Sequence, residues 1–296
     1  PMHIRILGAA AGGGLPQWNC GCRNCVDARA GRIAPMTQSS VAVSADGATW
    51  ALLNASPDIR TQLMDASCLH PTDLRGSPVA AVVITNADVD HIAGLLTLRE
   101  KTPFTLFATS QVLATLAENS VFNVLDASLV ARCALDLDTV KEILPGLTIT
   151  PISVPGKVAL FLEQGTVALE EVGEQTIGLL ITGGARTLAY LPGCAAIPDW
   201  LLDRLSGVDM LLFDGTVWEN DDMARTGTGE KTGARMGHVP MTGPKGSLAR
   251  FAALPARKTF VHINNTNPVL QPDSPERATL IAAGWDIAHD GMEITL

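Results

Sequence analysis

The segment Thr85-Asn86-Ala87-Asp88-Val89-Asp90-His91 constrains the fold of this chain more than any other. It follows an apolar stretch, Val79 to Ile84, that is typical of a buried strand, and it precedes an apolar-faced helix from Ile92 to Leu98. Acidic and imidazole side chains are therefore packed into a turn at the carboxyl end of a strand, where open α/β sheets present their ligand sites. A helix N-cap with charges that compensate the helix dipole would explain the acidic residues equally well. Other residues have to decide between capping and metal binding.

The rest of the chain alternates strands with helices. The sequence predicts a hairpin around Asp46-Gly47 and further strands at Val158 to Leu162 and Met210 to Phe213. Two β-rich halves with helices on their outer sides predict an α/β fold, a four-layer α/β/β/α sandwich, more than a simple doubly wound sheet. We expect a single domain over residues 1–296, with a long loop at about residues 214–244 that belongs to a lid or binding loop.

Composition argues against several classes of protein. The formal net charge of −9 argues against nucleic-acid binding, which would need a basic stripe on the surface. No run of about 18 apolar residues is present, so we expect no membrane span. The segment from Pro1 to Leu7 lacks a basic region followed by a long apolar core, so we expect no secretory signal and a cytoplasmic location.

Asp90 and His91 supply two candidate metal ligands, and a catalytic mononuclear site typically needs a third and an open position. The best third candidate is His262, which directly follows the apolar strand Thr259 to Val261. A histidine in such a place is also a common hydrogen-bonded core residue. Two imidazoles and one carboxylate make up the facial triad of non-haem Fe(II) oxygenases, but zinc hydrolases use the same set. The residues alone do not choose the metal.

A second constellation is Cys20-x-Cys22-x-x-Cys25, an N-terminal knuckle at about residues 18–26. Three thiolates at this spacing suit a closed tetrahedral zinc site, and we choose His238 as the fourth ligand of this structural zinc. A redox or incidental thiol cluster is the alternative. An iron–sulfur cluster is less favoured because a fourth cysteine at suitable spacing is lacking.

Motifs spread over nearly the whole chain resemble the pyrroloquinoline quinone (PQQ) biosynthesis protein B family, a divergent branch of the metallo-β-lactamase superfamily. The matching pieces are Leu7-Gly8-Ala9-Ala10-Ala11-Gly12-Gly13-Gly14, Pro16-Gln17-Trp18-Asn19-Cys20, Leu53-Asn54-Ala55-Ser56-Pro57-Asp58, Asp88-Val89-Asp90-His91, Leu191-Pro192-Gly193-Cys194, Arg235-Met236-Gly237-His238 and His262-Ile263-Asn264-Asn265-Thr266-Asn267-Pro268. The resemblance implies a metallo-β-lactamase-like sandwich.

The chain departs from the hydrolase pattern of that superfamily at the ligands of the first metal. Asn86 and Asp88 stand where the signature T-H-x-H-x-D-H has its first two histidines, and Lys157 stands where a Pro-Gly-His turn has its third. No bridging Asp follows the strand that ends at Leu191. These departures argue against a dinuclear zinc hydrolase, whereas the ligands of the second metal are complete.

The same departures suggest where a substrate binds. We expect Lys157 and Arg235 to bind carboxylates of an acidic substrate, with Asn86 and Asp88 in the same vacated pocket. Asp214, at the end of the strand Met210 to Phe213, is expected to orient a metal-binding histidine or to cap a turn.

The resemblance implies a role in making PQQ from a peptide-derived, cross-linked Glu-Tyr precursor. The favoured hypothesis is an oxidoreductase in which Asp90, His91 and His262 hold Fe(II), and O₂ serves to hydroxylate the tyrosine ring. The alternative is a carrier that assists transport of PQQ or its precursor towards the periplasm, and a zinc hydrolase is less favoured. The oligomeric state is not readable from the sequence, and a homodimer is one option.

Overall fold

Short apolar strands organise the chain into two β-sheets. The computed structural model describes residues 1–156 and 173–296, and within these ranges the strands form two seven-stranded sheets. The first sheet has the order β14 (Glu293–Thr295), β1 (His3–Gly8), β2 (Ser40–Ser44), β3 (Trp50–Leu53), β4 (Val79–Val83), β5 (Phe104–Thr109) and β6 (Val130–Leu135). The second has the order β13 (Trp285–Ile287), β12 (Arg257–Val261), β11 (Met210–Asp214), β10 (Arg186–Leu191), β9 (Ile177–Gly183), β8 (Leu147–Ser153) and β7 (Lys141–Leu144).

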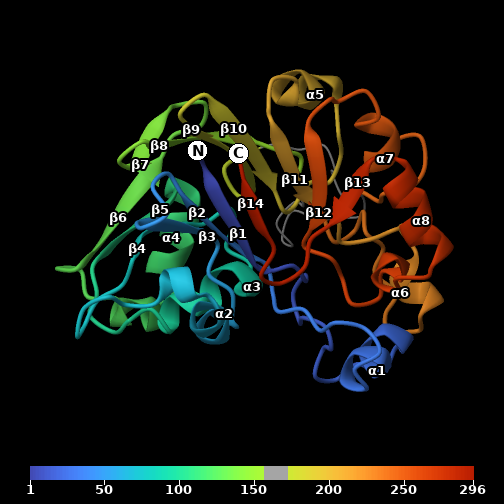
Figure 1. Cartoon of the computed structure of the whole chain (residues 1–296), viewed down its shortest axis with the longest axis horizontal. Coiled ribbons are helices and arrows are strands. Elements are labelled where there is room, and N and C mark those ends of the chain that lie inside the picture. Colours follow the sequence, from blue (N-terminus) through green and yellow to red (C-terminus); the bar gives the residue numbers. More distant parts are fainter. Residues whose placement is uncertain (157–172) are drawn as a thin grey trace.

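Helices cover the outer faces of both sheets, so the expected four-layer α/β/β/α sandwich is confirmed. Figure 1 shows α2, α3 and α4 beside the first sheet and α7 and α8 beside the second. The α-helices are α1 (Arg23–Arg29), α2 (Ile59–Asp65), α3 (Val89–Ile92), α4 (Ser110–Ala117), α5 (Asp199–Leu205), α6 (Asp222–Arg225), α7 (Ser247–Arg250) and α8 (Pro275–Ala282). Short 3₁₀ turns lie at Ser67–Leu69, Ala93–Leu96, Ser120–Val124 and Pro268–Leu270.

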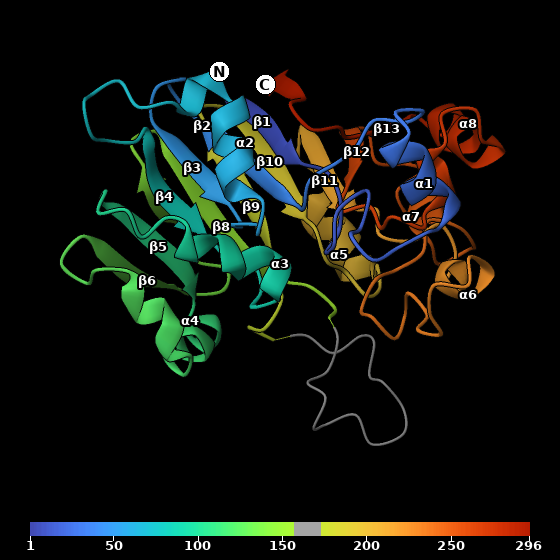
Figure 2. The same cartoon turned by 90° about the horizontal axis from the view of Figure 1, so that it is seen from below.

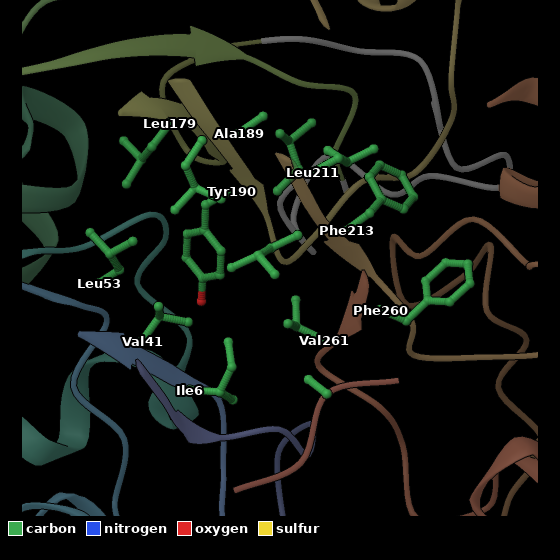
Figure 3. Packing of buried hydrophobic residues seen from close by; sticks show 14 of the residues in the cluster. Ile6, Val41, Leu53, Leu179, Ala189, Tyr190, Leu211, Phe213, Phe260 and Val261 are labelled. Carbon is green, nitrogen blue, oxygen red and sulfur yellow. The ribbon is translucent and has the colours of Figure 1, made fainter. Parts of the chain in front are cut away.

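The alternation of side chains along each strand divides the core into two apolar clusters. Val41 and Val43 of β2 belong to the cluster that also holds the second sheet, whereas Ala42 between them belongs to the cluster under α2 and α4. Figure 3 shows the contact between the sheets, with Val41 and Leu53 of the first sheet near Tyr190 of the second. The first of these clusters therefore joins the facing sides of the two sheets, which fixes their relative position.

The parallel part of each sheet directs its carboxyl ends to the junction between the two halves. Strands β3 to β6 run parallel in the first sheet, and β10 to β13 run parallel in the second. The turn after β4 and the turn after β12 meet there, and α3 lies at this boundary (Figure 2). A bridge between Ala10 and Ile263 joins the loop after β1 to the end of β12. This junction positions the candidate site.

Several predicted elements differ from the structure in extent. The helix predicted from Ile92 to Leu98 is instead α3 followed by the 3₁₀ turn Ala93–Leu96. The hairpin around Asp46-Gly47 is confirmed, because the Asp46 carboxylate accepts hydrogen bonds from the backbone N–H groups of Ala48 and Thr49. The strand predicted at Val158 to Leu162 lies outside the described residues. Within the described ranges, no helix is long and apolar enough to span a bilayer.

Candidate metal centre

Three side chains from two sheets converge at the junction. Asp90 and His91 lie in α3, directly after β4, and His262 directly follows β12. Their ligand atoms lie within 4.8 Å of one another. Nε2 of His262 lies 3.1 Å from Oδ2 of Asp90, and Nε2 of His91 lies 3.5 Å from the same oxygen. The structure thus brings together the three residues that the sequence proposed as one ligand set.

The capping explanation for the acidic residues is not supported. Asp88 is the N-cap residue of α3, but its side chain makes no capping hydrogen bond. Asp88 is exposed, and its charge acts to raise the pKa of both His91 and His262, as a nearby carboxylate does. Asp90 contacts both histidines, and the charge of Asp88 acts on both of them.

His91 is oriented by Asn86 in a way that leaves one ring nitrogen unpaired. Nδ1 of His91 donates a hydrogen bond of 2.7 Å to Oδ1 of Asn86, and the ring is fully buried. Nε2 then carries the lone pair, and within the described part of the chain it has no hydrogen-bond partner. A buried ring nitrogen without a partner is costly unless a ligand satisfies it. This orphaned atom, aimed at Asp90 and His262, fits a metal ion.

His262 is oriented through Thr216 and Asp214. Nδ1 of His262 lies 2.9 Å from the Thr216 hydroxyl, which in turn lies 2.6 Å from Oδ1 of the buried Asp214. Asp214 also accepts from the backbone N–H of Thr216 at 3.0 Å, so it makes both kinds of contact that the sequence suggested, to a histidine through Thr216 and to the turn. The backbone of His262 is left-handed, with φ of 56°, an uncommon conformation for a residue with a side chain. Such backbone strain costs on the order of 1–3 kcal/mol and clusters at functional sites.

The charges at the site are mutually dependent. Burial lowers the pKa of His91. Burial acts in the same direction on His262, but the hydrogen bond and charge of Asp90 outweigh it and raise the pKa of that ring. Burial acts to raise the pKa of Asp90, but the charge of His91 and the hydrogen bond with His262 hold it well below its usual range. A carboxylate thus stands between two imidazoles, a donor set that suits a divalent transition-metal ion.

The cysteine cluster forms, but His238 is not part of it. Cys20, Cys22 and Cys25 place their sulfur atoms within 4.8 Å of one another. Burial raises the pKa of the Cys25 thiol to about 12. His238 lies instead beside His262, with ring centroids 5.2 Å apart. Its Nδ1 donates a 2.6 Å hydrogen bond to Oδ2 of Asp214. The prediction of His238 as fourth ligand of the cysteine site is therefore wrong.

The knuckle is attached to the core by a different contact. Nδ2 of Asn24, in α1, donates hydrogen bonds to the backbone carbonyls of Asn265 and Asn267, at 2.8 and 2.9 Å. These residues follow His262 by a few positions. The cysteine cluster is therefore tied to the segment that follows the strand-end histidine His262.

The structure places the predicted substrate-binding residues unevenly. Asn86 is buried and its side-chain oxygen is committed to His91 and to the backbone N–H of Asp88. Arg235 is exposed, three residues before His238. Lys157 lies outside the described residues. The segment 214–244 carries the short helix α6 and otherwise no regular element among its described residues, as its composition predicts.

Two contributing residues were missed by sequence reasoning. Thr216 contacts Asp214 and His262, and its place two residues after the strand-end Asp214 is a signal that could have revealed it. Gly12 lies against the site, because a Cβ there would be 3.4 Å from Cγ of Asp90. Its place in the glycine-rich loop after β1 gave no indication of this neighbour.

Comparisons with known proteins agree with this geometry. A family model described as a beta-lactamase superfamily domain matches residues 49–263, which include all three candidate ligands. The chain is 58% identical over 295 residues to coenzyme PQQ synthesis protein B of Ruegeria pomeroyi, with 100% of both chains covered. It is 54% identical to PqqB of Methylobacterium extorquens, solved with bound Zn(2+), with a TM-score of 0.96 over 99% of this chain and 100% of that one. A diphosphatase of the PhnP family shares only the fold, at 21% identity and a TM-score of 0.69, over 100% of this chain and 98% of that one.

Proposed function

The chain belongs to the family of coenzyme PQQ synthesis protein B, within the beta-lactamase superfamily, and from this premise we propose that its part in PQQ biosynthesis is that of a non-haem iron-dependent hydroxylase. Its substrate is the tyrosine-derived ring of a Glu-Tyr precursor. The observation that carries this proposal is the set Asp90, His91 and His262, with the unpaired Nε2 of His91 aimed at the other two.

The ligand set supports one metal with open positions. Asp90, His91 and His262 would hold the ion, and three protein ligands leave room for substrate and O₂. The bound Zn(2+) of the relative from Methylobacterium extorquens supports metal binding by this fold. When bound, Fe(II) supplies the redox chemistry that O₂ activation requires, which Zn(II) lacks. Asn86 and Thr216 hold the two histidines so that each presents a lone pair to the ion.

The hydroxylation itself needs an external reductant. Replacing a ring C–H by C–OH with one atom of O₂ leaves the second oxygen atom, which two electrons and two protons convert to water. The precursor is acidic, so Lys157 and Arg235 would bind its carboxylates, as the sequence suggested. Asp88, which the sequence places in the same vacated pocket, is exposed, and its charge acts to raise the pKa of both histidines.

The cysteine knuckle would hold a second, structural zinc. Cys20, Cys22 and Cys25 supply three thiolates, and the fourth ligand comes from a group other than His238. Soft sulfur ligands in a closed site favour zinc over iron in this position. This zinc would stabilise the attachment of α1 without taking part in the reaction.

An oxygen electrode with metal-reconstituted protein tests the proposal. Protein prepared anaerobically is loaded with Fe(II) or Zn(II) and mixed with the Glu-Tyr precursor and ascorbate. We expect O₂ uptake above the rate of Fe(II) and ascorbate alone only when the Fe(II)-loaded protein and the precursor are both present, lost in His91→Ala and retained in the exposed-histidine control His70→Ala. Anaerobic cleavage of an ester or phosphodiester by the zinc form would instead identify a hydrolase. Tight PQQ binding that survives His262→Ala, without O₂ uptake, would identify a carrier.

A further inference from the structure

Asp214 is a buried carboxylate whose oxygens are all engaged by neighbours. Oδ1 accepts hydrogen bonds from the backbone N–H and the hydroxyl of Thr216, at 3.0 and 2.6 Å. Oδ2 accepts from the backbone N–H of Cys194 at 2.9 Å and from Nδ1 of His238 at 2.6 Å. Although Asp214 lies near two histidines, it has no oxygen left for a metal ion. Its role is to position other side chains.

The hydrogen-bond pattern fixes which nitrogen of each histidine carries the proton. A threonine hydroxyl has one proton, and the short contact to the Asp214 carboxylate takes it. Thr216 therefore accepts from Nδ1–H of His262, and Asp214 accepts from Nδ1–H of His238. Once a metal ion replaces the proton between Nε2 of His262 and Asp90, both rings have Nε2 as a lone-pair atom. The Asp214 carboxylate thus prepares two imidazoles in the same tautomer, but only one of them belongs to the ligand set.

The second imidazole, His238, lies directly against the first. The two rings are nearly parallel, at 26°, with centroids 5.2 Å apart. Nε2 of His262 reaches Asp90, whereas Nε2 of His238 has no hydrogen-bond partner among the residues that the structure describes. The His238 side chain is 16% exposed and Asp214 is fully buried, so a ligand has access to the ring and not to the carboxylate.

The neighbours of His238 place it close to Asn86, the residue at the first histidine position of the superfamily signature. A Cβ built on Gly193 would lie 3.8 Å from Cε1 of His238 and 4.0 Å from Nδ2 of Asn86. Asn86 stands at the first histidine position of the superfamily signature and orients His91. His238 and Asn86 thus flank the same glycine, on the side of the site where the chain lacks metal ligands.

We propose that His238 contacts the substrate, and that its Nε2 accepts a hydrogen bond from a phenolic hydroxyl bound next to the metal ion. This inference rests on the proposed function and names the group that selects an aromatic hydroxyl. An imidazole whose other nitrogen is bonded to a carboxylate is a strong acceptor. Asp214 is the positioning residue for this contact, through its 2.6 Å hydrogen bond from Nδ1 of His238.

The test measures binding without turnover. Full-length protein loaded with zinc is titrated with 4-nitrocatechol, a phenol whose absorption band shifts on binding, and the zinc content is measured in parallel. We expect His238→Ala to lower the affinity for 4-nitrocatechol by about tenfold or more, because a hydrogen bond in a shielded site is lost. His238→Gln, which retains an acceptor oxygen, should restore part of the affinity, and the exposed-histidine variant His70→Ala should bind as the wild type does.

The outcomes separate this inference from the proposed function. Equal affinity in wild type, His238→Ala and His238→Gln would overturn it, as would absence of 4-nitrocatechol binding to the wild type. Loss of active-site zinc in His238→Ala would also overturn it, because His238 would then act on the metal ligands. Binding that depends on His238 in a protein that never consumes O₂ would support the inference and refute the hydroxylase.

Discussion

Asn86 accepts a 2.7 Å hydrogen bond from Nδ1 of His91, and so supports a candidate metal ligand at a position where the superfamily signature has a ligand. The superfamily signature has a metal-binding imidazole at this position, whereas here an amide orients the imidazole of His91, a candidate ligand. The same oxygen also accepts from the backbone N–H of Asp88. Asn86 therefore couples the turn after β4 to the ring of His91.

Removing this hydrogen-bond acceptor should weaken metal binding at the candidate site. Asn86→Leu has a similar volume but offers no oxygen to Nδ1 of His91, so the ring loses its fixed tautomer and orientation. We expect metal affinity to fall by about 10–100-fold, measured by competition with a chromogenic chelator. Asn86→Asp keeps the oxygen and should stay near the wild type. Equal affinities in Asn86→Leu and the wild type would show that the hydrogen bond has no role in binding.

Thr216 offers a second test of orientation, on the other histidine. Thr216→Val removes the hydroxyl that joins Asp214 to His262 and leaves Nδ1 of a buried ring without an acceptor. We expect the free energy of unfolding to fall by about 1–3 kcal/mol in urea titration, with a parallel loss of metal affinity. Thr216→Ser keeps the hydroxyl and serves as the matched control. A valine variant as stable as the serine variant would contradict this account.

Gly94 should not tolerate a side chain. It lies in the 3₁₀ turn after α3, and a Cβ there would overlap the backbone carbonyl of Ser56. Gly94→Ala would push α3 and its two metal ligands away, at a cost of about 1–3 kcal/mol in thermal denaturation. Gly207→Ala is the control, because a Cβ at Gly207 has no neighbour within 4 Å. Similar melting temperatures for both variants would disprove the steric argument.

The gain in stability on metal binding should increase as the pH rises. The pKa of His262 is raised in the folded protein, so its protonated ring stabilises the metal-free fold below the unfolded pKa of about 6.5. That contribution is lost as the pH rises through the folded pKa. The metal needs the neutral ring and competes with this proton.

The gain in melting temperature on adding metal should therefore be larger at about pH 8 than at about pH 6. Calorimetry of metal-loaded and chelator-treated protein at both pH values measures this difference. A gain that is the same at both values would mean that no proton leaves the site when the ion binds.

Zinc binding at the cysteine site should not depend on His238. Substituting Cys25 with Ser should remove about one zinc per chain, because its sulfur lies within 4.8 Å of the two other thiols. His238→Ala should leave that zinc in place, since the ring lies against His262. The zinc content of each variant, measured by atomic emission with thiol titration as a second measure, tests both expectations. Loss of the thiolate-bound zinc in His238→Ala would restore the fourth-ligand prediction.

The fold was accessible from the sequence because buried strands have a local signature. The apolar run Met210 to Phe213 predicts a strand from its own residues, and the Asp46-Gly47 pair likewise predicts a turn. Strands β6 and β7 were missed because they lie at sheet edges, where polar residues such as Arg132, Lys141 and Glu142 interrupt the apolar pattern. Edge strands bury less surface and therefore carry a weaker signal.

The candidate site could be predicted in part from the sequence. Asp90 and His91 are adjacent, and His262 ends a strand, so the topology of an α/β sheet predicts that they meet. His238 was assigned to the wrong cluster because an isolated histidine more than two hundred residues from Cys25 carries no information on distance. Which cluster it joins is decided by Asp214, through a hydrogen bond that exists only in the folded chain.

The ligand set is divided between the halves of the molecule, since Asp90 and His91 come from the first sheet and His262 from the second. A polypeptide synthesised from its amino terminus thus has an incomplete coordination sphere until its last strands have docked. An ion can therefore bind the complete ligand set only after the two halves have docked, so it stabilises the assembled fold rather than starting its formation.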